Sequence, residues 1–135
     1  MTVRTAVATD DSSAKRVLVV AHGWSGVESI RQALQGKGIH IAHVAESRSE
    51  AMSFLEHTEV DVVVLHDEAL GAPSMDVARE LLGRRPSVRL VMCGPSADGL
   101  LLRQLLAVGV REWVWDNPPD QYELIDAIQR QARDW

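Results

Sequence analysis

The stretch Val60-Asp61-Val62-Val63-Val64-Leu65-His66-Asp67 decides the predicted fold. Four consecutive valine or leucine side chains follow Asp61, and the apolar run stops at His66 and Asp67. A short run of this kind is typical of a strand that is buried on both faces of a parallel sheet. In open parallel α/β sheets the functional crevice lies outside the carboxyl ends of the strands. The search for function therefore begins at His66 and Asp67.

Composition and charge exclude several classes of function. The 135 residues are 46% hydrophobic, which suits one globular domain with its own core. The chain has 19 Asp and Glu residues against 14 Lys and Arg. Nucleic-acid binding needs a basic stripe, so no nucleic-acid partner is predicted. The apolar runs are too short for membrane insertion and no secretion signal is present, so we predict a cytoplasmic protein. The single Cys93 allows no internal disulfide and fits a reducing compartment.

Strand and helix patterns alternate regularly along the chain. Residues 1–15 are small and polar, which predicts a flexible leader before a domain at 16–135. The predicted strands, each followed by an amphipathic helix, cover 17–20, 39–44, 60–65, 88–92 and 113–115. The strand at 39–44 lacks a continuous apolar run, which indicates an edge of the sheet. The candidate helix N-caps are Ser25, Ser47 or Ser49, Ser74 and Asp120.

This alternation predicts an α/β fold with one parallel sheet. Helices should cover both faces of the sheet, giving a three-layer sandwich. The flavodoxin-like strand order 2-1-3-4-5 would place the first and third strands side by side. Neither G-x-G-x-x-G nor G-x-x-x-x-G-K-[ST] occurs in the chain, so no loop that binds nucleotide phosphates is predicted.

The (βα)5 pattern resembles the CheY-like receiver domain of two-component response regulators. The residues that carry the resemblance are Arg16-Val17-Leu18-Val19-Val20, the run Val60 to Leu65, and Ala107-Val108-Gly109-Val110-Arg111-Glu112-Trp113-Val114. Such receivers bind Mg²⁺ through two acidic residues after the first strand, and an Asp at the end of the third strand takes the phosphoryl group. A Ser or Thr ends their fourth strand and a Lys ends the fifth.

The corresponding positions of this chain hold other residue types. The resemblance places the acidic pair at Ala21 and His22, the phosphoacceptor at His66, the hydroxyl at Gly94 and the lysine at Asp116. Asp67 is the one carboxylate beside the acceptor position, but strand alternation should turn it away from the pocket. We therefore predict a degenerate pseudo-receiver that is not an enzyme and has no cofactor. Phosphoryl transfer to Asp67 is the weakest alternative.

Three further hypotheses concern the same pocket. His66 and Asp116 could approach each other and hold one conformation without phosphate. Trp24, the two histidines His22 and His66, and the turn at Gly94 could form a small-molecule pocket. A metal sensor could use the same histidines with Asp67, Asp116 or Cys93, but no recognised ligand spacing is present, so no metal site is predicted.

The resemblance also implies a contact surface. Receivers make most partner and dimer contacts through the fourth helix, the fifth strand and the fifth helix. Here that face should include Leu101, Arg103, Gln104, Trp113 and Trp115. Trp and Arg are frequent interface anchors, and alternation places both tryptophans on one face of the strand. The favoured function is a phosphorylation-independent interaction module that docks a protein partner or an adjacent output domain, or that forms a homodimer.

A narrower resemblance concerns the end of the chain. The stretch Gly109-Val110-Arg111-Glu112-Trp113-Val114, followed by Pro118-Pro119-Asp120 and Glu123-Leu124, resembles the degenerate receivers at the N-terminus of CpaE/TadZ-type pilus-assembly ATPases. The ATPase domain of that family lies outside these 135 residues. Whether the native chain carries a further C-terminal domain stays open.

Overall fold

The structure, a computed structural model, describes residues 15–66, 74–94, 99–115 and 121–133. Five parallel strands form a single sheet in the order β2-β1-β3-β4-β5. The strands are β1 (Lys15–Val20), β2 (Ile39–Ala45), β3 (Val62–His66), β4 (Arg89–Gly94) and β5 (Glu112–Trp115). The predicted strand order is confirmed, including the position of β2 at an edge. β1 begins at Lys15, one residue inside the predicted leader.

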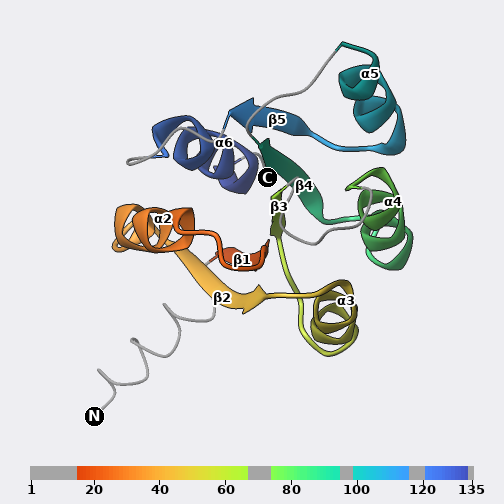
Figure 1. Cartoon of the computed structure of the whole chain (residues 1–135). Helices are drawn as coiled ribbons and strands as arrows, with labels where there is room; N and C mark the ends of the chain where they lie inside the picture. The colour runs from red at the N-terminus through yellow and green to blue at the C-terminus, as the bar shows by residue number, and fades with distance from the viewer. Residues whose placement is uncertain (1–14, 67–73, 95–98, 116–120, 134–135) are drawn as a thin grey trace.

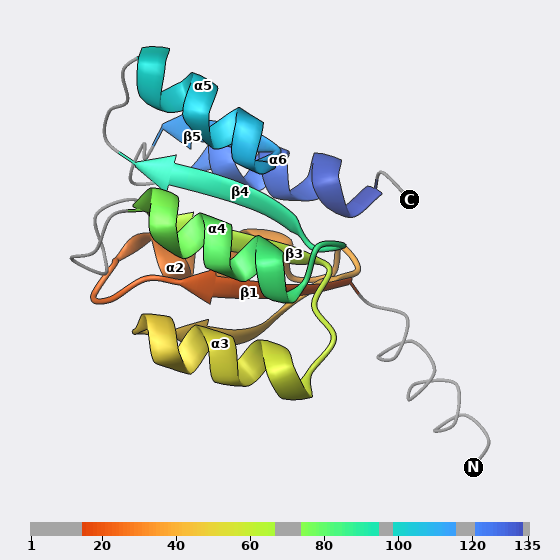
Figure 2. The same cartoon turned by 90° about the vertical axis from the view of Figure 1, so that its right-hand side faces the viewer.

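Helices cover both faces of the sheet. Those described are α2 (Gly26–Leu34), α3 (Arg48–His57), α4 (Ser74–Arg84), α5 (Gly99–Val108) and α6 (Tyr122–Arg133). Figure 1 looks along the sheet, with α2 and α6 on one side and α3, α4 and α5 on the other. Figure 2 faces the second side, where α3, α4 and α5 lie across the sheet. The predicted flavodoxin-like sandwich is therefore confirmed. Within the described ranges, no helix is both long and apolar enough to cross a membrane.

Alternation along the strands divides the apolar core into two layers. In β3, Val62 and Val64 pack with residues of α2 and α6, whereas Val63 and Leu65 pack with residues of α3 and α4. All four side chains are at most 1% exposed. Burying an aliphatic side chain of this size contributes about 1.5–3 kcal/mol of transfer free energy. The sequence of β3 therefore favours a place in the sheet that is covered on both faces, as β1 and β4 also are.

The edge strand β2 contains a bulge. Val17 of β1 pairs with Ile41, but Leu18 pairs with His43, so Ala42 is an extra residue in β2. A one-residue slip exchanges the faces to which the following side chains point. His43 accordingly lies on the α3 side, where its ring stacks on Phe54 with centroids 4.8 Å apart.

Of the predicted N-cap serines, Ser47 makes the capping hydrogen bond, whereas Ser25 precedes its helix without making one. Ser47 has extended backbone, and its Oγ accepts a hydrogen bond from the Glu50 amide at 3.1 Å, as an N-cap should. Ser25 also precedes its helix, but its backbone is already helical and its side chain makes no capping bond. Ser74 is the first residue of α4. Asp120 lies outside the described residues.

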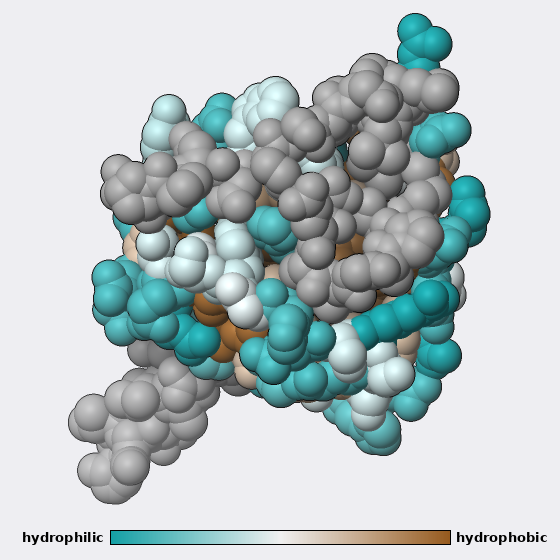
Figure 3. Space-filling model, in the orientation of Figure 1, coloured by the Kyte–Doolittle hydropathy of each residue, from teal (hydrophilic) through white to brown (hydrophobic). Residues whose placement is uncertain are grey.

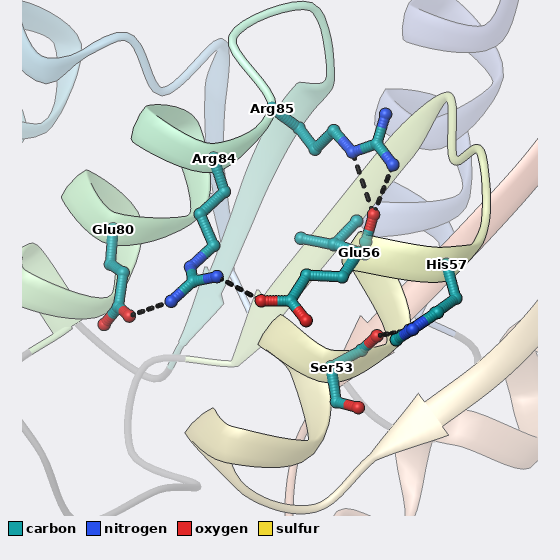
Figure 4. Close-up of polar contacts among 7 residues, drawn as sticks. Ser53, Glu56, His57, Glu80, Arg84 and Arg85 are labelled. Atoms are coloured by element: carbon teal, nitrogen blue, oxygen red, sulfur yellow. Dashed lines mark hydrogen bonds and ion pairs between the residues drawn. The ribbon is translucent and has the colours of Figure 1, made fainter.

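Two arginines at the end of α4 join it to α3, as Figure 4 shows. Arg84 Nη1 donates to Glu56 Oε2 at 2.5 Å, and Nη2 lies 3.6 Å from Glu80 Oε2. Arg85 donates from Nε and Nη2 to the carbonyl oxygen of Leu55, at 2.8 and 2.5 Å. Carbonyls in the last turn of a helix lack an intrahelical partner. Arg85 therefore caps α3 while it holds α4 in place.

β5 is tied to α6 by the carboxylate of Glu112. This group accepts from Arg130 Nε at 3.1 Å and Nη2 at 2.6 Å, and from Gln131 Nε2 at 2.8 Å. The hydrogen bond from Arg130 lowers the pKa of Glu112 below its ordinary value; partial burial opposes this shift and the Gln131 bond adds to it. Two parallel bonds to one guanidinium fix orientation as well as distance. The angle of α6 against β5 is therefore defined by side chains as well as by the core.

We expect Arg85→Ala to lower the free energy of unfolding by about 1.5–3 kcal/mol, because the Leu55 carbonyl loses two charge-assisted hydrogen bonds. Arg84→Ala is the matched control: its guanidinium is 42% exposed and its partner Glu56 is 52% exposed. Exposed pairs of this kind contribute at most about 1 kcal/mol. Urea denaturation of both variants is the measurement, and equal losses would contradict the assignment of Arg85 as the cap.

Candidate functional site

The carboxyl ends of β1, β3 and β4 bring three predicted pocket residues to the same edge of the sheet. Val20 pairs with Leu65, so Ala21 follows beside His66. His66 pairs with Cys93, and Gly94 is the next residue of β4. Ala21, His66 and Gly94 are all buried. The topology therefore assembles this part of the pocket as the resemblance implied, but from a methyl group, an imidazole and a glycine.

The two residues at the position of the acidic pair differ in environment. Ala21 is 1% exposed and packs with the α2 and α6 layer, and its amide donates to the carbonyl of Ala45 at 2.9 Å. The His22 side chain is 68% exposed, and its Nδ1 lies 3.8 Å from Glu46 Oε1. Hard divalent cations take oxygen ligands, which neither side chain offers.

His66 lies under the indole of Trp24. The His66 residue is 8% exposed, and its ring centroid is 4.8 Å from that of Trp24, with an angle of 44° between the ring planes. Trp24 also packs against the apolar layer beneath α2 and α6. The predicted aromatic wall of a small-molecule pocket is thus an indole that packs onto the sheet edge. Of the two histidines, His22 is exposed and His66 belongs to the interior.

The corner beside His22 is a junction between β2 and α3. Glu50 Oε2 lies 2.7 Å from His43 Nε2, and Glu50 Oε1 accepts from the Glu46 amide at 3.1 Å. The Glu46 amide, followed by His43, lowers the pKa of Glu50 below its ordinary value. Among the residues that the structure describes, no group of three or more His, Cys, Asp or Glu side chains is arranged to hold a metal ion.

Two predicted pocket residues, Asp67 and Asp116, lie outside the described residues. The contact of His66 with Asp116 therefore stays a prediction. The same holds for Asp67 as a phosphoacceptor.

Three residues of the predicted contact surface are exposed, and its role in binding stays a prediction. Arg103 and Gln104 on α5 are exposed, and Trp115 is 49% exposed at the end of β5. Trp113 is half-buried and packs against the core layer beneath α3 and α4, while Val114 faces the opposite layer. The alternation predicted for β5 is confirmed by these packing partners. The side chain of Leu101 lies outside the described residues.

Two exposed apolar residues were missed by the sequence reasoning. Leu106 is 58% exposed and Tyr122 is 60% exposed. Leu106 follows Arg103 by three residues, so helical spacing was a signal that could have placed it on the same side of α5. Nothing in the sequence distinguished Tyr122. We use the term docking face for the exposed residues Arg103, Gln104 and Leu106 of α5, Trp115 of β5 and Tyr122 of α6. Figure 1 shows that α5 and α6 lie on either side of β5, at the edge of the sheet. On the side drawn in Figure 3, the described side chains are mainly hydrophilic, with small apolar areas between them.

Comparison with solved structures identifies the fold. A CheY-like receiver domain from Methanospirillum hungatei matches with a TM-score of 0.77 at 17% identity, over 90% of this chain and 96% of that chain. The receiver domain of the response regulator NarL from Mycobacterium tuberculosis matches with a TM-score of 0.77 at 17% identity, over 91% and 99%. A Burkholderia pseudomallei response regulator with a phosphorylated aspartic acid, calcium ion and citrate matches with a TM-score of 0.70 at 13% identity, over 87% and 72%.

No protein-family model matches the sequence, and no curated protein matches it significantly. The chain has the CheY-like receiver fold of response regulators.

The burial of His66 gives a direct prediction. We expect His66→Ala to lower the free energy of unfolding by about 2 kcal/mol, because it removes a buried ring that supports Trp24. His22→Ala is the control, and it should change the free energy by less than about 0.5 kcal/mol because its side chain is solvated. Chemical denaturation followed by far-ultraviolet circular dichroism measures both. If His66→Ala leaves the free energy of unfolding unchanged, the ring is not part of the packed edge.

Proposed function

We propose that this chain is a receiver-like signalling domain that acts as an interaction module without phosphoryl transfer. The observation that carries the proposal is the chemistry of the carboxyl edge. Phosphoryl transfer in receivers needs carboxylate oxygens for the cation, a carboxylate nucleophile and a hydroxyl group. The described residues at these positions are Ala21, His22, His66 and Gly94, which supply none of the three.

Packing at the same edge supports this proposal. Trp24 covers His66 at the carboxyl end of β3, and Ala21 beside it is sealed into the core. At this edge Trp24, His66 and Ala21 therefore pack against their neighbours. The domain would then stabilise this edge through its own side chains, without phosphate. On this account it is a pseudo-receiver, not an enzyme, and needs no cofactor.

The docking face supplies the binding surface of the proposal. Trp115 and Tyr122 expose aromatic rings that combine apolar area with a polar tip, a combination that is frequent at interfaces. Arg103 adds a charged group that suits interface anchoring. We propose that the occupant is a protein partner, an adjacent output domain or a second copy of the chain. A cytoplasmic location and a place in pilus assembly remain predictions of the sequence.

The proposal predicts that the domain is not phosphorylated. After incubation with acetyl phosphate and Mg²⁺, intact-mass spectrometry should detect no phosphoryl adduct, whereas a receiver with the full acidic site serves as the positive control. An adduct on this chain would contradict the proposal. In that case Asp67→Asn would show whether Asp67 carries the group, and the domain would be an active phosphoacceptor.

A further inference from the structure

The start of α2 has no room for a side chain at Gly26. A Cβ atom there would lie 2.5 Å from Cζ2 and 2.6 Å from Cε2 of Trp24, and 2.9 Å from Nε2 of Gln121. The atoms it would meet belong first to an indole that is itself packed against His66, with ring centroids 4.8 Å apart. A fused ring that also packs against His66 moves aside less readily than the end of a flexible chain. Gly26 is therefore the residue that lets Trp24 take this position.

Gln121, whose side chain also borders Gly26, has a strained backbone. Its φ is +55°, and it is the one non-glycine residue with positive φ in the described part of the chain. The left-handed conformation costs an ordinary residue roughly 1–2 kcal/mol. The residue is nevertheless only 1% exposed, with its amide group directed to Gly26. Its carbonyl oxygen accepts the bond from the Ile125 amide, at 3.0 Å, that begins α6.

We propose that Trp24 is an internal latch for the docking face. Seated on Gly26 and His66, the indole confines the Gln121 side chain, which holds the left-handed backbone and so sets the first turn of α6. Tyr122 is the next residue, and its exposed ring belongs to the docking face. Strained backbone persists only where its surroundings enforce it, so unseating Trp24 should release Gln121 and loosen this turn.

The latch rests on the proposed function, because it regulates the surface to which that function assigns partner binding. Coupling between two sites is reciprocal. A partner that binds Tyr122 in the latched position must therefore also favour the seated indole. Trp24, at the edge of the sheet, would then control the conformation of the α6 turn that carries Tyr122 in the docking face.

The test is Gly26→Ala, with Gly83→Ala as the matched control, because an added Cβ at Gly83 in α4 meets nothing within 4 Å. Fluorine NMR of fluorotryptophan-labelled protein follows Trp24 among the four tryptophans. Gly26→Ala should shift the Trp24 resonance and make hydrogen exchange at the Ile125 amide about tenfold faster, since local opening controls that rate. Gly83→Ala should change neither.

Two results would overturn the latch. One is an unshifted Trp24 resonance in Gly26→Ala, and the other is a shifted resonance with unchanged exchange at Ile125. Because the Cβ added at Gly26 also meets Gln121 directly, Trp24→Leu is measured beside Gly26→Ala, and it serves alone if Gly26→Ala does not fold. Trp24→Leu removes the ring without a clash and should also speed exchange at Ile125; unchanged exchange there would overturn the proposal equally. Failure of the latch is distinguishable from failure of the proposed function, which depends on the phosphoryl adduct and not on exchange in α6.

Discussion

Strand β3 is buried on both faces, and the alternation of its side chains determines what can happen at the end of the sheet. Val62 and Val64 belong to the layer beneath α2 and α6, and His66 is the next residue with the same orientation. The imidazole must therefore emerge toward the β1–α2 connection, where Trp24 meets it. The same two-residue period that builds the core thus directs the buried His66 side chain toward Trp24, at the position where the resemblance places the phosphoacceptor.

This substitution changes the electrostatics of the edge. Carboxylates that share a site repel one another, and a bound cation relieves that repulsion. The resemblance places Ala21, His22 and His66 at the carboxylate positions of this edge and Gly94 at the hydroxyl position. Ala21 and His66 make apolar and aromatic contacts there instead. On the proposed function, an edge stabilised in this way needs no ion to complete it. Its conformation then depends on the fit of Trp24 against Gly26 and His66, which is a property of the folded chain itself.

Most of the fold could be predicted from the sequence because the spacing of apolar residues along each strand and helix indicates which side chains are buried. The regular alternation of strands and helices predicted the parallel sheet, and the flavodoxin-like order supplied the strand order. The weaker pattern of β2 predicted the edge strand. Ser47 was one of two serines predicted as the cap of α3, and the structure shows that Ser47 is the cap. The bulge at Ala42 could not be predicted, because it depends on which residue of β1 each residue of β2 meets. Ser25 failed as a cap because its backbone is already helical, which composition does not reveal.

The candidate site was predictable only in part, for a related reason. The positions of Ala21, His66 and Gly94 follow from topology once the strands are known. The contact of Trp24 with His66 joins residues that are 42 positions apart, and the positive φ of Gln121 occurs at a residue whose side chain borders Gly26. Neither has a short sequence signature. The exposure of Leu106 and Tyr122 likewise depends on how α5 and α6 pack against the sheet.

The packing of Trp24 on His66 and Gly26 at the sheet edge is measured most directly by nuclear Overhauser contacts. These contacts join the Trp24 indole protons to the protons of His66 and Gly26. They should be recorded on the isotopically labelled chain before and after Mg²⁺ and beryllofluoride are added. The account predicts contacts from the indole to both residues, with the same intensity in both samples. Absence of these contacts in the free protein, or their loss when Mg²⁺ and beryllofluoride are added, would show an open edge that responds to a phosphoryl mimic. That result would contradict the account.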